Sequence, residues 1–160
     1  MLPVGEQAGR WARLLAFALP AGLLGGAYIS QYGFGLYPCE MCWWQRYPHF
    51  VALPLAALAL LRPPGKPLVG LAALAVLISG LIGGYHAGVE YGWWQGFTAC
   101  TSMVQTGGNA LDAILNAPMI RCDQVQWELF GISLAGFNFL ISTVGALLVF
   151  ALLARSARSA

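Results

Sequence analysis

The chain has 160 residues and a formal net charge of +2, but its composition is not that of a soluble domain. Charged residues make up 9% of the chain and apolar residues 59%, against roughly 25% and 45–50% in soluble domains. The basic residues are scattered singly or in pairs, which excludes a basic face for nucleic acid, and the hydrophobicity excludes intrinsic disorder. The composition therefore predicts an all-α membrane protein.

Four stretches are apolar and long enough, at about 20 residues, to cross a bilayer as helices. They cover about residues 14–32, 43–61, 68–89 and 132–153. Residues 1–160 are thus predicted to form a single four-transmembrane-helix bundle with outer loops at about 33–42 and 90–128. The first stretch is interpreted as a retained helix rather than a cleaved signal peptide, because it is longer than the usual h-region and lacks a clear cleavage site.

Basic residues in the short loops predict the orientation of the bundle. One side, which holds both termini and the turn between the second and third stretches, carries Arg10, Arg13, Arg62, Lys66, Arg155 and Arg158. The other side carries Arg46 and Arg121, together with five of the six acidic residues. Because cytoplasmic loops are enriched in Lys and Arg, both termini are predicted to be cytoplasmic and the two longer loops to face outward.

All four cysteines, Cys39, Cys42, Cys100 and Cys122, fall in the two outer loops. Disulfides persist on that side of the membrane, and four cysteines allow three pairings among which the spacing does not choose. One interpretation is that two permanent disulfides stabilise the outer loops. However, the CxxC of Cys39 and Cys42 would close a very short loop, where a cross-link stabilises little and thiols often have lowered pKa values. The spacing of this pair therefore favours redox exchange.

A zinc site is the alternative use of a CxxC. A zinc site built from four cysteines typically repeats the C-x2-C spacing. Here Cys100 and Cys122 are separated by 21 residues, and neither outer loop contains a histidine. The sequence therefore predicts no metal site.

Arg46 follows the CxxC at the start of the second predicted helix. We expect Cys42 to open this helix, whose N-terminal partial positive charge favours a thiolate. Arg46 lies four residues further along, on the same helix face. It could extend to head-group phosphate, but a cation just inside the bilayer boundary also suits an anionic redox intermediate.

His86 is a second ionisable residue near the outer end of a predicted helix, with Glu90 four residues later. It either forms a hydrogen bond at the interface or acts as a proton donor or hydrogen-bond partner to a cofactor. His49, two turns into the second helix, is given no role.

The second outer loop combines an aromatic segment with an amphipathic one. Residues 91–97 (YGWWQGF) are typical of the membrane interface. Residues 109–117 (NALDAILNA) place apolar side chains at i, i+3 and i+4, which predicts a short amphipathic helix lying flat on the membrane. Cys100 and Cys122 flank this helix, and a loop tethered in this way suits disulfide exchange.

Two segments resemble those of a known family. Residues 37–46 (YPCEMCWWQR) resemble the PCxxCxxxR signature of the DsbB family of disulfide-generating membrane oxidoreductases, and residues 121–131 (RCDQVQWELFG) resemble its cysteine segment before the last helix. The likeness covers nearly the whole chain. The chain departs from the commoner pattern at Glu40-Met41, where two apolar residues are usual.

The resemblance implies a relay of electrons through two cysteine pairs. A reduced DsbA-like thioredoxin-fold protein of the periplasm would attack a Cys100–Cys122 disulfide and form a mixed disulfide on Cys100. Cys122 would then exchange with Cys39 and leave Cys42 as a thiolate beside a bound quinone.

The resemblance also implies a cofactor site and a location. Arg46 and His86 match the quinone-site residues, and the quinone, ubiquinone or menaquinone, would carry the electrons to the respiratory chain. The chain would be a multi-pass protein of the bacterial inner membrane, in contact with lipid, with its cysteine loops in the periplasm. Two alternatives remain open: a structural four-span protein with stapled loops, and a quinone-linked reductase that works in the reverse direction.

Overall fold

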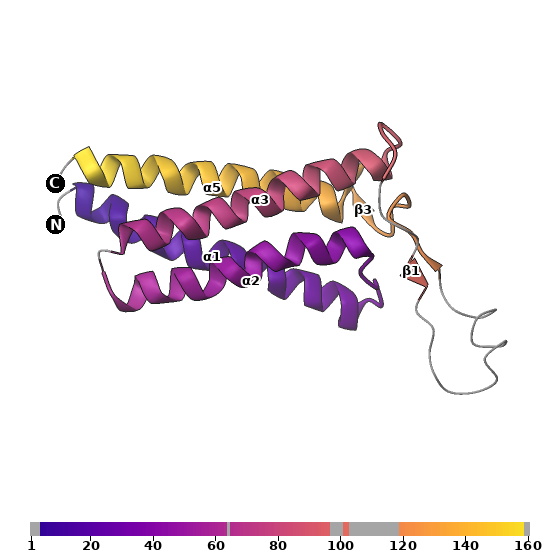
Figure 1. Cartoon of the computed structure of the whole chain (residues 1–160), viewed down its shortest axis with the longest axis horizontal. Coiled ribbons are helices and arrows are strands. Elements are labelled where there is room, and N and C mark those ends of the chain that lie inside the picture. Colours follow the sequence, from indigo (N-terminus) through magenta and orange to yellow (C-terminus); the bar gives the residue numbers. More distant parts are fainter. Residues whose placement is uncertain (1–3, 64, 97–100, 103–118, 159–160) are drawn as a thin grey trace.

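The computed structural model describes residues 4–63, 65–96, 101–102 and 119–158, and its long elements are all helices. The helices are α1 (Val4–Gly33), α2 (Glu40–Leu61), α3 (Lys66–Glu90) and α5 (Leu134–Arg158). Two short antiparallel pairs join β1 (Thr101–Ser102) to β2 (Met119–Ile120) and β3 (Glu128–Leu129) to β4 (Ile132–Ser133). Figure 1 shows both termini at one end of the bundle and the strands at the other. The predicted helix at residues 109–117 and Cys100 lie outside the described residues.

The helices form a bundle in which sequence neighbours pack side by side. The main contacts join α1 to α2, α2 to α3, α3 to α5, and α5 back to α1. This arrangement, with the chain reversing at each connection, is an up-down-up-down bundle. Every helix therefore presents one face to the interior and another to the surroundings.

Three helices, α1, α3 and α5, are long and apolar enough to cross a membrane. Their outward surfaces carry many exposed Leu, Ile and Val side chains, which is the surface that lipid requires. The helix α2 is less apolar because it contains Gln45, Arg46 and His49, all of which are buried within the bundle. The membrane class is thus supported, and a fourth crossing by α2 stays a prediction.

The helix bounds differ from those expected. Hydropathy marks only the residues of the lipid core, whereas backbone hydrogen bonding continues into the polar ends. The helix α2 begins at Glu40 with Cys39 as its N-cap, so the expectation that Cys42 opens the helix was wrong and Cys42 lies in the first turn. The last helix begins at Leu134 rather than residue 132, because a turn with positive φ at Phe130 and Gly131 places residues 132–133 in β4.

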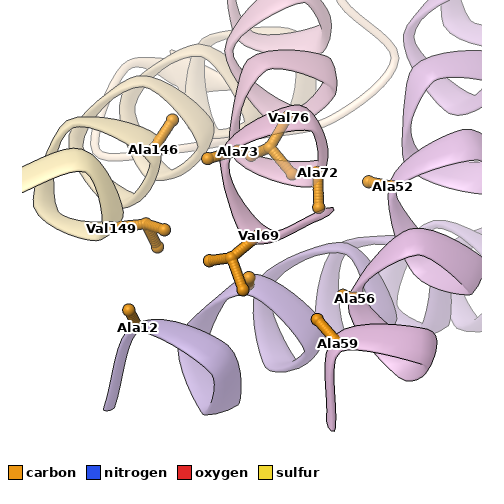
Figure 2. Close-up of a cluster of buried hydrophobic side chains, with 11 residues drawn as sticks. Ala12, Ala52, Ala56, Ala59, Val69, Ala72, Ala73, Val76, Ala146 and Val149 are labelled. Atoms are coloured by element: carbon orange, nitrogen blue, oxygen red, sulfur yellow. The ribbon is translucent and has the colours of Figure 1, made fainter. Parts of the chain in front are cut away.

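Small residues fill the half of the bundle nearest the termini. Figure 2 shows alanines and valines from the four helices meeting at short range. The cluster consists of Ala12, Ala16, Ala52, Ala56, Ala59, Val69, Ala72, Ala73, Val76, Ala146 and Val149. Small side chains let helix backbones approach closely, which increases van der Waals contact where lipid supplies no hydrophobic drive. This close packing makes it the closed half of the bundle, and the cavity described below lies at the loop end.

Gly83 marks a close approach of α3 to α5 and offers a test of this packing. A Cβ at Gly83 would lie 2.9 Å from the Ala135 carbonyl oxygen, a backbone atom that cannot rotate away. We expect Gly83→Ala to lower the free energy of unfolding in detergent by roughly 1–3 kcal/mol through overpacking. Gly25→Ala is the matched control, because its Cβ meets nothing within 4 Å. Equal thermal unfolding midpoints for the two variants would contradict this contact.

Candidate functional site

A cavity of about 370 Å³ lies in the loop half of the bundle, and all four helices contribute to its lining. Its wall is mostly apolar, with leucine, glycine and alanine residues of α1 and leucine and alanine residues of α5. The polar lining groups from the helices and the first outer loop are Ser30, Tyr37, Cys39, Cys42, Gln45, Arg46, His49, His86, Glu90 and Asn138. An apolar cavity with a few convergent polar groups is the usual form of a small-molecule site.

The CxxC forms the N-terminal turn of α2 at the edge of this cavity. The backbone N–H of Cys42 donates to Cys39 Sγ over 3.3 Å, so Cys39 caps the helix with its sulfur. The Cys39 thiol in turn donates to Cys42 Sγ over 3.1 Å. Cys39 is 1% exposed, whereas Cys42 is half-buried. The geometry therefore keeps the proton on Cys39 and the negative charge on Cys42.

The pKa of Cys39 agrees with this assignment. A hydrogen bond with Cys122 acts to lower the pKa of the Cys39 thiol, but its hydrogen bond to Cys42 and its burial together raise that pKa to about 12. At neutral pH the Cys39 thiol is thus protonated and serves as a hydrogen-bond donor. The thiolate is the nucleophilic form of a cysteine, and in this pair it forms where the negative charge is stabilised, which is at Cys42.

Cys122 reaches the CxxC from the second outer loop. It is 7% exposed and packs in one cluster with Cys39, Met41, Val89 and Ile120. The sulfurs of Cys39 and Cys122 and a ring nitrogen of His86 all lie within 4.8 Å of one another. Cys39, Cys42 and Cys122 form no disulfide with one another. The fold therefore brings two cysteines separated by more than 80 residues to a distance from which exchange needs little movement.

His86 lies beneath the sulfurs, at 1% exposure. The Gln45 side-chain amide donates to His86 Nδ1 over 2.8 Å, which leaves the ring proton on Nε2. Nε2 is 3.6 Å from Cys39 Sγ and 3.8 Å from a Glu90 carboxylate oxygen. The contact expected between His86 and Glu90 exists, but the shorter contact is with the cysteine.

Arg46 is held inside the bundle. Its guanidinium donates to Gln31 Oε1 over 2.6 Å and to the Ala27 carbonyl over 3.3 Å. It also lies 5.0 Å above the ring of Tyr28 and 4.9 Å above the ring of Trp43. At 6% exposure the side chain is directed at protein rather than extended to the surface. A cation fixed in this way, one turn from Cys42, can stabilise negative charge in the cavity.

A chain of polar side chains continues from the cysteines into the bundle. Asn138 of α5 donates to Gln45 Oε1 over 2.9 Å and to Ser79 Oγ over 3.1 Å. His49 Nε2 is 2.9 Å from Ser79 Oγ and 3.2 Å from Asn138 Oδ1. His49 Nδ1 is buried without a hydrogen-bond partner among the described residues, and His49 lines the cavity. A bound group with a polar atom would satisfy it.

Sequence reasoning missed Gln31, Gln45, Ser79 and Asn138, and gave His49 no role. A signal for them existed, because polar side chains inside an apolar span are functional candidates in the same way as ionisable ones. The predicted residues Cys39, Cys42, Arg46 and His86 line one cavity, and Cys122 packs beside Cys39 at its edge. Cys100 falls outside the described residues.

The fold and site define a helical membrane protein with a buried dithiol beside an apolar cavity. The family model described as disulfide bond formation protein DsbB matches residues 9–152. The chain is 34% identical over 149 residues to disulfide bond formation protein B of Aromatoleum aromaticum, covering 87% of this chain and 89% of that protein. It is 33% identical over 158 residues to the protein of the same name in Verminephrobacter eiseniae, covering 92% and 86%. No solved structure is a significant match.

This chain belongs to the DsbB family of disulfide bond formation proteins. The resemblance seen in the cysteine motifs is thereby confirmed, and the chain is a disulfide-forming oxidoreductase of a membrane family.

Proposed function

We propose that this chain is a protein-dithiol:quinone oxidoreductase of the bacterial inner membrane. It reoxidises a DsbA-like thioredoxin-fold protein of the periplasm and passes the electrons through two cysteine pairs to a quinone. The observation that carries the proposal is the position of Cys122 beside Cys39, with Cys42 on the wall of an apolar cavity.

The relay balances as two dithiol–disulfide exchanges. A partner thiolate attacks Cys100, breaks the Cys100–Cys122 disulfide and releases the Cys122 thiolate. This thiolate then attacks Cys39, breaks the Cys39–Cys42 disulfide and releases the Cys42 thiolate. The partner's second thiol breaks the mixed disulfide on Cys100 and leaves as an oxidised protein. Cys100 then resolves the Cys39–Cys122 bond. The net result is one partner disulfide made and the Cys39–Cys42 pair reduced.

The cavity fits a quinone in its chemistry. A quinone supplies an acceptor for two electrons and two protons, and it needs an apolar wall with donors for its oxygens. The wall is mostly apolar, and Arg46 is a donor on it. His49 Nε2 contacts the acceptor Asn138 Oδ1, so Nδ1, which has no partner among the described residues, is an acceptor that suits a hydroxyl of the quinol. The residues that would hold the ring are Arg46, His49 and His86, all of which line the cavity.

The chain's own residues stabilise the charge and place the proton at the CxxC. The helix terminus and the Cys39 thiol stabilise the negative charge on Cys42, and Arg46 does so from one turn below. His86 Nε2–H lies beside Cys39 and can return a proton to that sulfur. The drive comes from the difference in reduction potential between the quinone and the partner: for two electrons, each 30 mV by which the quinone is more positive is about 1.4 kcal/mol.

The distribution of basic residues supports the orientation. The connection between α2 and α3, with Arg62 and Lys66, lies at the same end of the bundle as the two termini (Figure 1). By the positive-inside rule that end is cytoplasmic, which places the cavity and the cysteines at the periplasmic side.

Coupled turnover tests the proposal. Detergent-purified protein is mixed with a reduced thioredoxin-fold periplasmic substrate and a soluble quinone, and quinone reduction and substrate thiol loss are followed together. We expect consumption in a 1:1 ratio, abolished in Cys39→Ser and in Cys100→Ser. Gly25→Ala controls for handling, because its added methyl group touches nothing within 4 Å.

Two results would contradict the proposal. Inert disulfides and no quinone consumption, over a range of partners and quinones, would indicate a structural protein with stapled loops. Net reduction of the partner by quinol would indicate the reverse reaction.

A further inference from the structure

Cys39, Cys122 and His86 form a cluster whose composition is that of a metal site. Their ligand atoms lie within 4.8 Å of one another, and all three side chains are buried. Neither outer loop contains a histidine, so the loop sequences by themselves predict no zinc site. Folding supplies the histidine from α3, next to cysteines of both loops.

The spacing within the cluster agrees with tetrahedral zinc. Bonds of about 2.3 Å to sulfur and about 2.0–2.1 Å to nitrogen place two sulfurs roughly 3.8 Å apart, and a sulfur and a nitrogen roughly 3.6 Å apart. The observed distance from Cys39 Sγ to His86 Nε2 is 3.6 Å. The remaining pairs are within 4.8 Å, so small side-chain rotations bring the three atoms to one ion.

The surroundings also suit a cation. A carboxylate oxygen of Glu90 lies 3.8 Å from His86 Nε2 and adds negative charge next to the cluster. The Gln45 amide contacts His86 Nδ1 over 2.8 Å, in the position of the outer-shell partner that orients a metal-bound imidazole. For Nε2 to bind a metal, the ring proton moves to Nδ1 and this amide turns its oxygen toward it.

We propose that the reduced chain binds one Zn²⁺ through Cys39 Sγ, Cys122 Sγ and His86 Nε2, with water in the fourth position. Binding releases two thiol protons, leaves the imidazole neutral, and changes no oxidation state. The bound ion occupies the two sulfurs that the relay must join, so zinc holds the protein in its reduced form. A disulfide at either cysteine removes a ligand and excludes the ion.

Metal retention by the purified protein tests this site. The full chain in detergent is reduced, freed of reductant, incubated with Zn²⁺ and desalted, and the bound metal is counted. Co²⁺ is used in parallel, because its thiolate charge-transfer absorption reports sulfur ligation. We expect one ion per reduced chain, and none after oxidation. Cys122→Ser and His86→Gln are expected to weaken binding by roughly 100-fold or more, because even outer-shell changes cost about 10–100-fold.

Matched controls separate this cluster from other cysteines and histidines. Cys100→Ser and His49→Gln remove the same residue types without removing a proposed ligand, and both are expected to retain one tightly bound ion. Far-UV circular dichroism confirms that each variant is helical. The comparison of reduced with oxidised wild-type protein needs no substitution and stands even if a variant misfolds.

Three results would overturn the proposal. These are no retained metal in the reduced wild-type chain, equal retention in the oxidised chain, and a loss in Cys100→Ser or His49→Gln as large as that in Cys122→Ser. The readout is metal content and absorption, so the proposal can fail while thiol-to-quinone turnover succeeds, and the reverse.

Discussion

Replacing Cys122 with serine is expected to stop coupled turnover while leaving the Cys39–Cys42 pair intact. In the proposed relay Cys122 carries electrons between the loops, and it lies in one buried cluster with Cys39. Serine keeps the shape of the side chain but cannot form a disulfide. We expect the rate of substrate oxidation to fall by at least about 10³-fold, in the range seen when a nucleophile is removed.

Three measurements on Cys122→Ser locate the block. Partner oxidation is expected to cease. A mixed disulfide between the partner and Cys100 is expected to be absent, because Cys100 no longer has a disulfide with residue 122 for the partner to attack. Quinone reduction driven by dithiothreitol through Cys39 and Cys42 is expected to continue. If the variant still oxidised the partner at more than a few per cent of the wild-type rate, the relay would not pass through Cys122. Loss of the dithiothreitol reaction as well would assign Cys122 a structural role.

Replacing Arg46 with alanine is expected to weaken quinone reduction while the disulfides still form. The guanidinium is the fixed positive charge nearest to Cys42 along α2, and it lines the cavity. Removal of a preorganised donor from a developing anion costs about 10²–10³-fold in rate. We therefore expect kcat/KM for the quinone to fall by about 10²-fold, mainly because electron transfer to the quinone is slower.

Arg46→Lys is the matched variant, because it keeps the charge and loses the geometry. Lysine cannot reproduce the two hydrogen bonds to Gln31 and Ala27 or the stacking on Tyr28. An intermediate rate is expected, with the thiol content of both variants equal to that of wild type. An unchanged rate at limiting quinone in Arg46→Ala would show that the quinone does not bind beside this residue.

The sequence by itself determined the class of the protein and the type of its chemistry. A low content of charged residues and long apolar stretches predict membrane helices in any fold. Each side chain contributes its own free energy of transfer from water to lipid, so the sum can be taken from the sequence. The CxxC of Cys39 and Cys42, with Arg46 on the next turn, is likewise local. This motif can be recognised from the spacing of its residues along the chain, and the family model confirms the resemblance to DsbB that the motif indicated.

The bounds of the helices were less predictable. Hydropathy placed the second helix from Trp43, but it starts at Glu40, because the Cys39 sulfur caps it. A cap is a hydrogen bond of one particular side chain and leaves no trace in a hydropathy sum. The same applies to the turn at Gly131 that delays the start of α5.

The tertiary structure alone decided which distant groups share the site. It brought Cys122 and His86 to the CxxC, and it aligned Gln45 with Asn138 across the bundle. Local periodicity gives each helix a face but not its rotation against its neighbours. That rotation is set by the contacts of small residues such as Gly83 and the alanines of the closed half, which are properties of pairs of helices. A cluster of two cysteines and a histidine, from two loops and a helix, is therefore visible in the fold and absent from the spacing of its residues.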